Sequence, residues 1–427
     1  MGARVVSGQA PVVALDGAAS AIASARRAVV ADRYAADALA VEWRRLDQLS
    51  SIADDWRDLA ERSVEPNIFY EPSFARAAVP VFGKDAGAIL VWSKATPRRL
   101  LGFFPSRIET RRYGVKLPVL VGWTHPYAPL GVPLVETGGA EPIIAAWLAH
   151  IAADASLPGL LVLPFLPEAG AFAAALSAIL RRARMPFADF NHHQRALLQP
   201  NEGQQFDERP FYVEQSLGQH QHKELRRHWR RLSDAGAILF TVATERAPVA
   251  AALEDFFSLE AGGWKGRVGT AAAGDDAVRR FVGNAVEALA AEGGVAIERI
   301  LVDGRAIAAA IILRSGRFAW FWKIAYDERF ARFSPGVMLS VVVTDDLLDD
   351  LSIASTDSCA TAHHPMIDHL WRERLALCDR VVAVRPQAPF ALAHRLERLR
   401  ATGIAGARHL RGLLPSNRNY RRRNTIR

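Results

Sequence analysis

The stretch FAWFWKIAYDERFARFSPGVMLSVVVTDDLL, from Phe318 to Leu348, decides the fold. Its apolar beginning predicts a buried strand that ends at Tyr326, and a polar loop follows. Ser334, Pro335 and Gly336 then open a long helix, because serine is a good N-cap and proline is tolerated in the first turn. The segment therefore predicts a strand, a loop and a helix start in close succession.

The start of this helix is a candidate anion site. Helix N-termini present unpaired N–H groups and partial positive charge, which suits a pyrophosphate. Gly336 would let a ligand approach the exposed amides. An ordinary helix cap beside solvated arginines would have the same sequence, so that alternative stays open. The candidate residues for binding a diphosphate-bearing cofactor are Arg332, Ser334, Pro335, Gly336, Val337 and Met338.

Strands and helices alternate on both sides of this segment. Before it we expect helices at Val249 to Glu260 and Asp275 to Glu292, and strands at Val295 to Leu301, Ile307 to Leu313 and Phe318 to Tyr326. After it we expect a helix at Ser334 to Leu351, a strand at Ser352 to Asp357, a helix near Met366 to Leu375 and a strand at Arg380 to Val384. The three strands joined by tight turns predict a meander, and the alternation indicates an α/β layer.

The first half of the chain repeats this order. It predicts a helix at Asp54 to Ser63, a hairpin of Ala88 to Trp92 with Leu100 to Ile108, a helix at Pro142 to Ala155, a strand at Leu160 to Leu166 and a helix at Ala169 to Arg184. A period of about 150 residues is far too long for a solenoid. The predicted fold class is therefore α/β with a mixed sheet, in two tandem domains that lie side by side.

The predicted domain boundaries follow changes in composition. Residues 1–40 are Ala-rich and are expected to form a flexible extension, and residues 41–198 form the first domain. Residues 199–235 hold a polar linker and a strongly basic helix. Residues 236–390 form the second domain, and the Arg-rich residues 391–427 are expected to be a frayed basic tail.

Composition narrows the functional class. The chain has 427 residues, a net charge of +8 and 50% apolar residues, which suits two or three domains with large cores. Its two cysteines, Cys359 and Cys378, exclude a disulfide framework and fit a reducing compartment. No apolar run approaches the roughly 20 residues of a membrane span, and no secretory signal is visible. We therefore expect a soluble, cytoplasmic protein with an anionic partner.

Several motif-based functions are excluded. The histidine pairs form neither a His-Glu-x-x-His motif nor a Cys/His knuckle, so no metal is expected. The chain contains no Gly-Lys-Ser/Thr phosphate loop and no Gly-x-Ser-x-Gly elbow. The P-loop kinase and α/β-hydrolase classes are therefore excluded.

Six segments resemble acetyltransferase (GNAT) proteins of the CelD-like and Fem-like kind, which are built from two GNAT halves. They are NIFYEPSFARA (67–77), GVPLVE (131–136), KELRRHWRRLSDAG (223–236), GWKGRVGTA (263–271), AYDERFARFSPGVML (325–339) and STDSC (355–359). The resemblance covers roughly Val41 to Phe390. It implies transfer of an acyl group from acetyl-CoA or another acyl-CoA to an amine or hydroxyl, with a sugar or polysaccharide precursor as the acceptor.

This implied reaction has physical requirements that can be set against the sequence. The thioester carbonyl needs hydrogen-bond donors for its developing oxyanion, which the strand Trp320 to Tyr326 would supply. The acceptor needs a base, and the leaving thiolate needs an acid. The candidate catalytic residues are Asp357, Tyr326 and His364, and the candidate substrate-binding residues are Trp264, Lys265, Trp322 and His363. A turn cap at Asp357, solvated histidines and a structural role of Trp264 are the alternatives.

Two other functions remain open. Gln219 to Ser233 predicts a helix with a basic face, formed by Lys223, Arg226, Arg227, Arg230 and Arg231. This face suits tRNA, which a Fem-like aminoacyltransferase would use, or another anionic surface, although a solvated inter-domain helix is the commoner case. The usual GNAT phosphate loop, Gln/Arg-x-x-Gly-x-Gly/Ala, is absent, and only Gly336 stands where two glycines are expected. A non-catalytic adaptor in polysaccharide synthesis is the third alternative.

Overall fold

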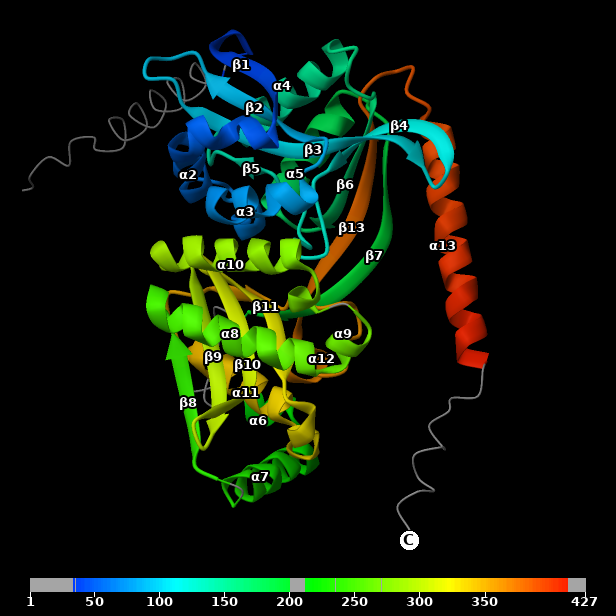
Figure 1. The fold of residues 1–427 in the computed structure, drawn as a ribbon. Helices are drawn as coiled ribbons and strands as arrows, with labels where there is room; N and C mark the ends of the chain where they lie inside the picture. The colour runs from blue at the N-terminus through cyan, green and yellow to red at the C-terminus, as the bar shows by residue number, and fades with distance from the viewer. Residues whose placement is uncertain (1–33, 35, 200–211, 235, 270, 414–427) are drawn as a thin grey trace, which may run out of the picture.

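The computed structural model describes residues 34, 36–199, 212–234, 236–269 and 271–413. These residues form one continuous mixed sheet with helices on both faces (Figure 1). The strand order is β1-β2-β3-β4-β6-β13-β7-β12-β11-β10-β9-β8, and the short β5 pairs with β3. The mixed α/β class that the sequence predicts is confirmed.

The first half of the sheet is built from residues up to 198. Its elements are β1 (Leu39–Arg45), α2 (Ala53–Glu61), α3 (Pro72–Phe82), β2 (Ala86–Ser93), β3 (Leu100–Arg112), β4 (Val115–Gly122), β5 (Leu134–Val135), α4 (Ala140–Ala153), β6 (Leu160–Pro167), α5 (Ala171–Arg182) and β7 (Phe187–Leu198). The predicted hairpin is confirmed as β2 and β3, and β6 is the predicted buried strand. Every residue of β2 is buried, because this apolar strand lies inside the sheet with helices against it.

The second half follows the same order. Its elements are α6 (Tyr212–Ser216), α7 (Gln219–Ser233), β8 (Ile238–Ala243), α8 (Arg246–Gly262), α9 (Trp264–Arg267), α10 (Asp276–Ala291), β9 (Val295–Val302), β10 (Arg305–Ser315), β11 (Phe318–Tyr326), α11 (Pro335–Asp349), β12 (Ser355–Asp357), α12 (Ile367–Leu370), β13 (Glu373–Ala383) and α13 (Phe390–Leu413). The predicted meander is confirmed as β9, β10 and β11. Helices α8 and α10 pack on one face of these strands and α11 packs on the other.

The two halves exchange their last strands. β13 lies between β6 and β7 and is antiparallel to both, while β7 also pairs with β12. The two long strands run side by side from one half of the molecule to the other (Figure 1). The sequence assigns residues 373–383 to the second domain, whereas the structure places this strand beside β6 of the first half. The halves therefore share one sheet rather than packing two separate ones.

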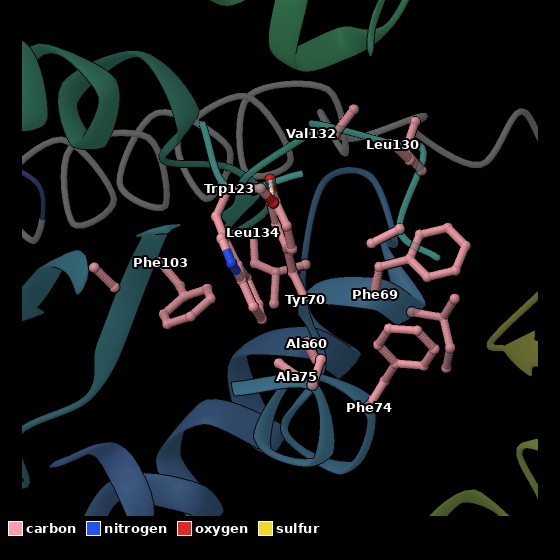
Figure 2. Close-up of a cluster of buried hydrophobic side chains, with 14 of the residues drawn as sticks. Ala60, Phe69, Tyr70, Phe74, Ala75, Phe103, Trp123, Leu130, Val132 and Leu134 are labelled. Carbon is pink, nitrogen blue, oxygen red and sulfur yellow. Dashed lines mark hydrogen bonds between the residues drawn. The ribbon is translucent and has the colours of Figure 1, made fainter. Parts of the chain in front are cut away.

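A buried polar anchor organises the core of the first half. The Asn67 side chain accepts a hydrogen bond from the Phe69 N–H (3.1 Å) and donates to the carbonyls of Leu130 (3.2 Å) and Val132 (2.9 Å). Within the hydrophobic cluster around it, the Tyr70 hydroxyl donates to the Trp123 carbonyl at 2.7 Å (Figure 2). Because buried polar groups need partners, these bonds fix the segment before α3 against the loop that follows β4.

Aromatic side chains connect the halves. Phe281 of α10 lies edge-on to Phe74 and Phe82 of α3, with ring centroids 5.5 Å apart in both pairs. Phe69 meets Trp320 of β11 at 6.1 Å. The hydrophobic core thus runs without a break from the first half into the second.

Two secondary-structure predictions were wrong. The helix expected near Met366 to Leu375 is only the four residues of α12, because residues from 373 onward pair in β13. The expected frayed tail begins instead with the long helix α13, whose Phe390, Ala393 and Leu396 pack against the sheet beside Phe190. Most of the predicted extension, much of the polar linker and the last residues of the tail lie outside the described residues.

Candidate functional site

A cavity opens where β11 and β12 diverge. These parallel strands pair only at Phe318 with Ser355, Ala319 with Thr356 and Trp320 with Asp357. β12 then ends, while β11 continues to Tyr326. The space between them holds a cavity of about 670 Å³, bounded by α9, β11, the start of α11 and the loop after β12.

A β-bulge shapes the wall that β11 contributes. Its register against β10 shifts so that Phe321 lies opposite Ile312 and Lys323 lies opposite Ile311, which leaves Trp322 without an opposite residue. A bulge bends a strand and re-aims its side chains. Trp322 and Lys323 consequently both line the cavity. The Trp322 ring is fixed by a hydrogen bond from its Nε1 to the Tyr127 carbonyl of the first half, at 2.8 Å.

The cavity brings together eight of the residues that the sequence singles out. They are Trp264, Lys265, Trp322, Tyr326, Ser334, Gly336, Val337 and His364. Five others lie elsewhere. His363 is exposed, Pro335 is buried, Arg332 stacks on Phe333 (4.7 Å), Met338 faces a groove beside α7, and Asp357 lines a separate pocket between the halves. The roles proposed for all of these residues stay predictions.

The start of α11 differs in detail from the sequence expectation. Ser334 stands at the N-cap position as expected, but it adopts a left-handed conformation (φ 55°) and its side chain makes no capping hydrogen bond. A Cβ placed on Gly336 would lie 3.1 Å from Cδ1 of Tyr326, so the glycine makes room for this ring. The first N–H groups of a helix have no partner inside it, and Gly336 and Val337 occupy these positions on the cavity wall.

Asp357 is engaged in a buried ion pair. Its carboxylate accepts a hydrogen bond from Nη2 of Arg195 on β7, and the two residues are 6% and 1% exposed. Arg195 also donates to the Pro129 carbonyl at 2.8 Å, and Asp357 accepts from the Cys359 N–H at 2.9 Å. The ion pair holds β12 to a strand of the other half. The hydrogen bond from the Cys359 N–H is the turn cap that the sequence left open as an alternative role of Asp357.

Two lysines reach the cavity in different environments. Lys265 donates to Oε1 of Glu260 at 2.8 Å, and Oε2 of the same carboxylate accepts from the Ala272 N–H at 2.8 Å. The Nζ of Lys323 lies 4.1 Å from the centre of the Tyr127 ring. Burial, assisted by the charge of Lys265, lowers the pKa of Lys323 to about 8. The cavity therefore contains one lysine held by a carboxylate and one that faces aromatic rings.

His364 is a further titratable group at the cavity. Its Nδ1 accepts a long hydrogen bond (3.4 Å) from the Met366 N–H, which places the hydrogen of the neutral ring on Nε2. Burial lowers the pKa of His364 and favours this neutral form. The ring can therefore donate a hydrogen bond from Nε2.

Sequence reasoning missed Lys323, Glu260, Cys359 and Arg195 as neighbours of the site. A signal for Lys323 was present, because it is the one charged residue in the strand segment FAWFWKIAY. The ion pair of Arg195 depends on the exchange of strands and has no local signal. Among the described residues, no group of three or more side chains is arranged to bind a metal, and no helix is long and apolar enough to cross a membrane.

Comparison with known proteins finds a family match within the second half. A family described as acetyltransferase (GNAT) domain matches residues 219–359, from α7 to just beyond β12. No curated protein matches the chain. The fold is similar to that of FemX, with a TM-score of 0.53 and 11% identity over 80% of this chain and 98% of that one. A conserved protein of unknown function from Bacteroides thetaiotaomicron gives a TM-score of 0.49 and 10% identity over 80% of this chain and 99% of that one. Residues 219–359 thus match the acetyltransferase (GNAT) domain family.

Proposed function

We propose that the protein is an acyltransferase that takes its acyl group from acyl-CoA and transfers it to an amine or hydroxyl in the β11–β12 cavity. The observation that carries this proposal is the cavity itself, which is lined mostly by residues of the segment that matches the GNAT family and lies where two parallel strands separate beside a helix N-terminus. A bound acyl-CoA would supply an acyl carbonyl that is activated by its thioester bond.

The cavity residues suit such a donor. A volume of about 670 Å³ accommodates the arm and acyl group of a ligand of this size. The amides of Gly336 and Val337 would bind the diphosphate at the helix start. The bulged strand at Trp322 would direct backbone N–H groups at the acyl oxygen. His364 Nε2–H and the Tyr326 hydroxyl are the proposed proton donors, and the Tyr326 ring packs against Gly336 at the start of α11.

The proposed acceptor is a sugar or polysaccharide precursor. The CelD-like resemblance suggests this class, and the exposure of Trp264 supports it. Trp264 is 53% exposed at the cavity. Its main-chain N–H donates a hydrogen bond to Glu328 Oε1 at 2.6 Å, which fixes the backbone and leaves the indole free to contact a ligand. An exposed aromatic face beside Lys265 suits a sugar ring that carries polar groups.

Aminoacyl transfer from tRNA is a second candidate, favoured by the basic face of α7. Arg227 pairs with Glu224 (3.1 Å) and Arg226 lies 3.8 Å from Glu214. Within the described part of the chain, Lys223, Arg230 and Arg231 take part in no ion pair. Neutralising these three residues should abolish salt-sensitive binding of tRNA if this candidate is correct, and should leave acyl-CoA binding unchanged if it is wrong.

Calorimetry with acetyl-CoA on the full chain tests the main proposal. Two substitutions at one position give the control: Val337→Gln and Val337→Glu are nearly the same size and differ in charge. The carboxylate should repel the diphosphate and weaken binding more than tenfold relative to the amide, which corresponds to about 1.4 kcal/mol. Equal affinities of the two variants would contradict the diphosphate site at Val337. No binding by the unmodified protein would overturn the acyl-CoA proposal and leave the tRNA-dependent and adaptor alternatives.

A further inference from the structure

We propose that Lys323 is a modification site of this protein, where the side-chain amine is acylated by the acyl-CoA that the β11–β12 cavity holds. This inference rests on the proposed function, because the acyl donor is the one proposed there. It assigns to the protein a second acceptor, which is part of its own chain.

The position of Lys323 carries the inference. The residue follows the bulged Trp322 on β11, at the place where the acyl carbonyl would meet the strand, and it lines the cavity. Its Nζ lies over the Tyr127 ring at 4.1 Å and 5.9 Å from the Trp322 ring. Among the described residues, no carboxylate pairs with this amine. The nitrogen therefore lies beside aromatic rings rather than beside a counter-ion, on a residue that lines the cavity.

The chemical form of the amine supports the same conclusion. Only a neutral amine is a nucleophile, and burial lowers the pKa of Lys323 to about 8. About half of the molecules then carry a neutral Lys323 at pH 8. The other lysine of the cavity is different, because the ammonium of Lys265 donates to Glu260 at 2.8 Å. Lys265 is thus a built-in comparison within the same cavity.

The reaction is a simple acyl transfer. The nitrogen lone pair of Lys323 attacks the thioester carbonyl carbon, a C–N bond forms and the C–S bond breaks. Coenzyme A leaves as the thiol and takes up the proton that the nitrogen loses. The product is a neutral amide in place of a cation, and the acyl chain remains in the cavity. Acylation at Lys323 would therefore close the site to external acceptors.

Mass spectrometry of the full chain after incubation with acetyl-CoA at pH 8 tests the proposal. We expect acetylation at Lys323 at least tenfold above that at Lys265 and at the exposed Lys84. The K323R variant should lose this product, and Val337→Glu should reduce it in proportion to its loss of acetyl-CoA binding. Acetylation of Lys323 no greater than that of Lys84, in a protein that calorimetry shows to bind acetyl-CoA, would overturn the inference and leave the proposed function intact. A protein that binds no acetyl-CoA would overturn both.

The pH dependence separates a cavity reaction from surface chemistry. With a pKa of about 8, the acetylation rate should rise about fivefold from pH 7 to pH 8 and less than twofold from pH 8 to pH 9. An ordinary surface lysine reacts about tenfold faster for each unit over this range. Trinitrobenzenesulfonate, which needs no coenzyme A site, should label Lys323 with the same profile in the unliganded protein. A tenfold rise per unit at Lys323 with both reagents would contradict the proposal.

Discussion

Each half of the molecule has a junction, the place where two paired parallel strands separate, and the two junctions differ. In the first half, β4 and β6 form a parallel pair at Leu120 with Leu161 and Val121 with Val162, as β11 and β12 do in the second. The loop after β4 then fills the space between the strands. A Cβ on Gly131 of this loop would lie 1.9 Å from the Pro164 carbonyl oxygen of β6, so the main chains are in direct contact. The corresponding space in the second half is the candidate cavity.

The difference indicates that the two halves of this repeated fold have different roles. The filled junction contains the fully buried Trp123, whose Nε1 donates to the Phe82 carbonyl at 2.9 Å. The open junction contains Lys323 and the exposed Trp264. The loop that fills the first junction also supplies Tyr127, which holds Trp322 and lies beneath Lys323. The first half has thus become a support for the site of the second.

The largest expected effect comes from emptying the filled junction. Trp123→Ala removes a buried indole and its hydrogen bond, and should destabilise the protein by about 3–5 kcal/mol in chemical denaturation. Trp264→Ala, at the open junction, should change stability by less than about 0.5 kcal/mol, because the side chain is half exposed. Equal losses for the two variants would contradict the distinction between a filled and an open junction.

The next effect tests the link between the halves. Arg195→Leu removes the cation from the buried Asp357 carboxylate, which keeps the hydrogen bond from the Cys359 N–H, and should cost about 3 kcal/mol in the free energy of unfolding. The control is Arg182→Leu, which breaks an exposed pair with Glu141 (3.0 Å) and should cost less than about 1 kcal/mol. A loss at position 195 no larger than the control would show that the exchanged strands do not depend on this pair.

The smallest effect concerns strands β2 and β9, which occupy equivalent places in the two halves. β2 is apolar throughout, whereas β9 carries Glu298, which is 2% exposed. Burial first, and then the charge of Asp346, raise the pKa of Glu298 to about 8, while Arg314 acts in the opposite direction. The folded state binds this proton more tightly than the unfolded state, so stability should fall as the pH rises from about 4.5 to about 8.

Glu298→Gln removes this titration. The variant should be more stable than the unmodified protein at pH 8 by about 1–3 kcal/mol, and the gain should shrink toward pH 5. Glu287→Gln, which changes an exposed carboxylate paired with Arg246, should leave the pH profile unchanged. Parallel curves for Glu298→Gln and the unmodified protein would exclude Glu298 as the cause of the pH dependence.

Local patterns were sufficient for much of the fold. The apolar runs of β2, β6 and β9 to β11, and the helical spacing of α7, α8 and α10, could be predicted because each depends on neighbouring residues. Strand β7 was missed because FADFNHHQRALL mixes polar and apolar residues, and the strand is only partly buried. Its partners lie far away in the sequence, so no local pattern marks it.

The candidate site was predictable only in part. The helix start at Gly336 and Val337 could be placed, because proline and glycine mark it. Lys323 is marked as the one charged residue of its strand, but the bulge at Trp322 that precedes it could not be read from the sequence, because it depends on pairing with β10. The engagement of Asp357 by Arg195 requires the exchange of strands, which depends on tertiary pairing alone.

The exchange of last strands also governs the order in which the protein can be assembled. Leu163 of β6 lies opposite Arg380 of β13, which the ribosome makes roughly 200 residues later. The edge of β6 that pairs with β13 therefore remains unpaired until most of the chain has been synthesised. An unpaired strand edge invites association with other chains, so the newly made first half depends on protection until its missing strand arrives.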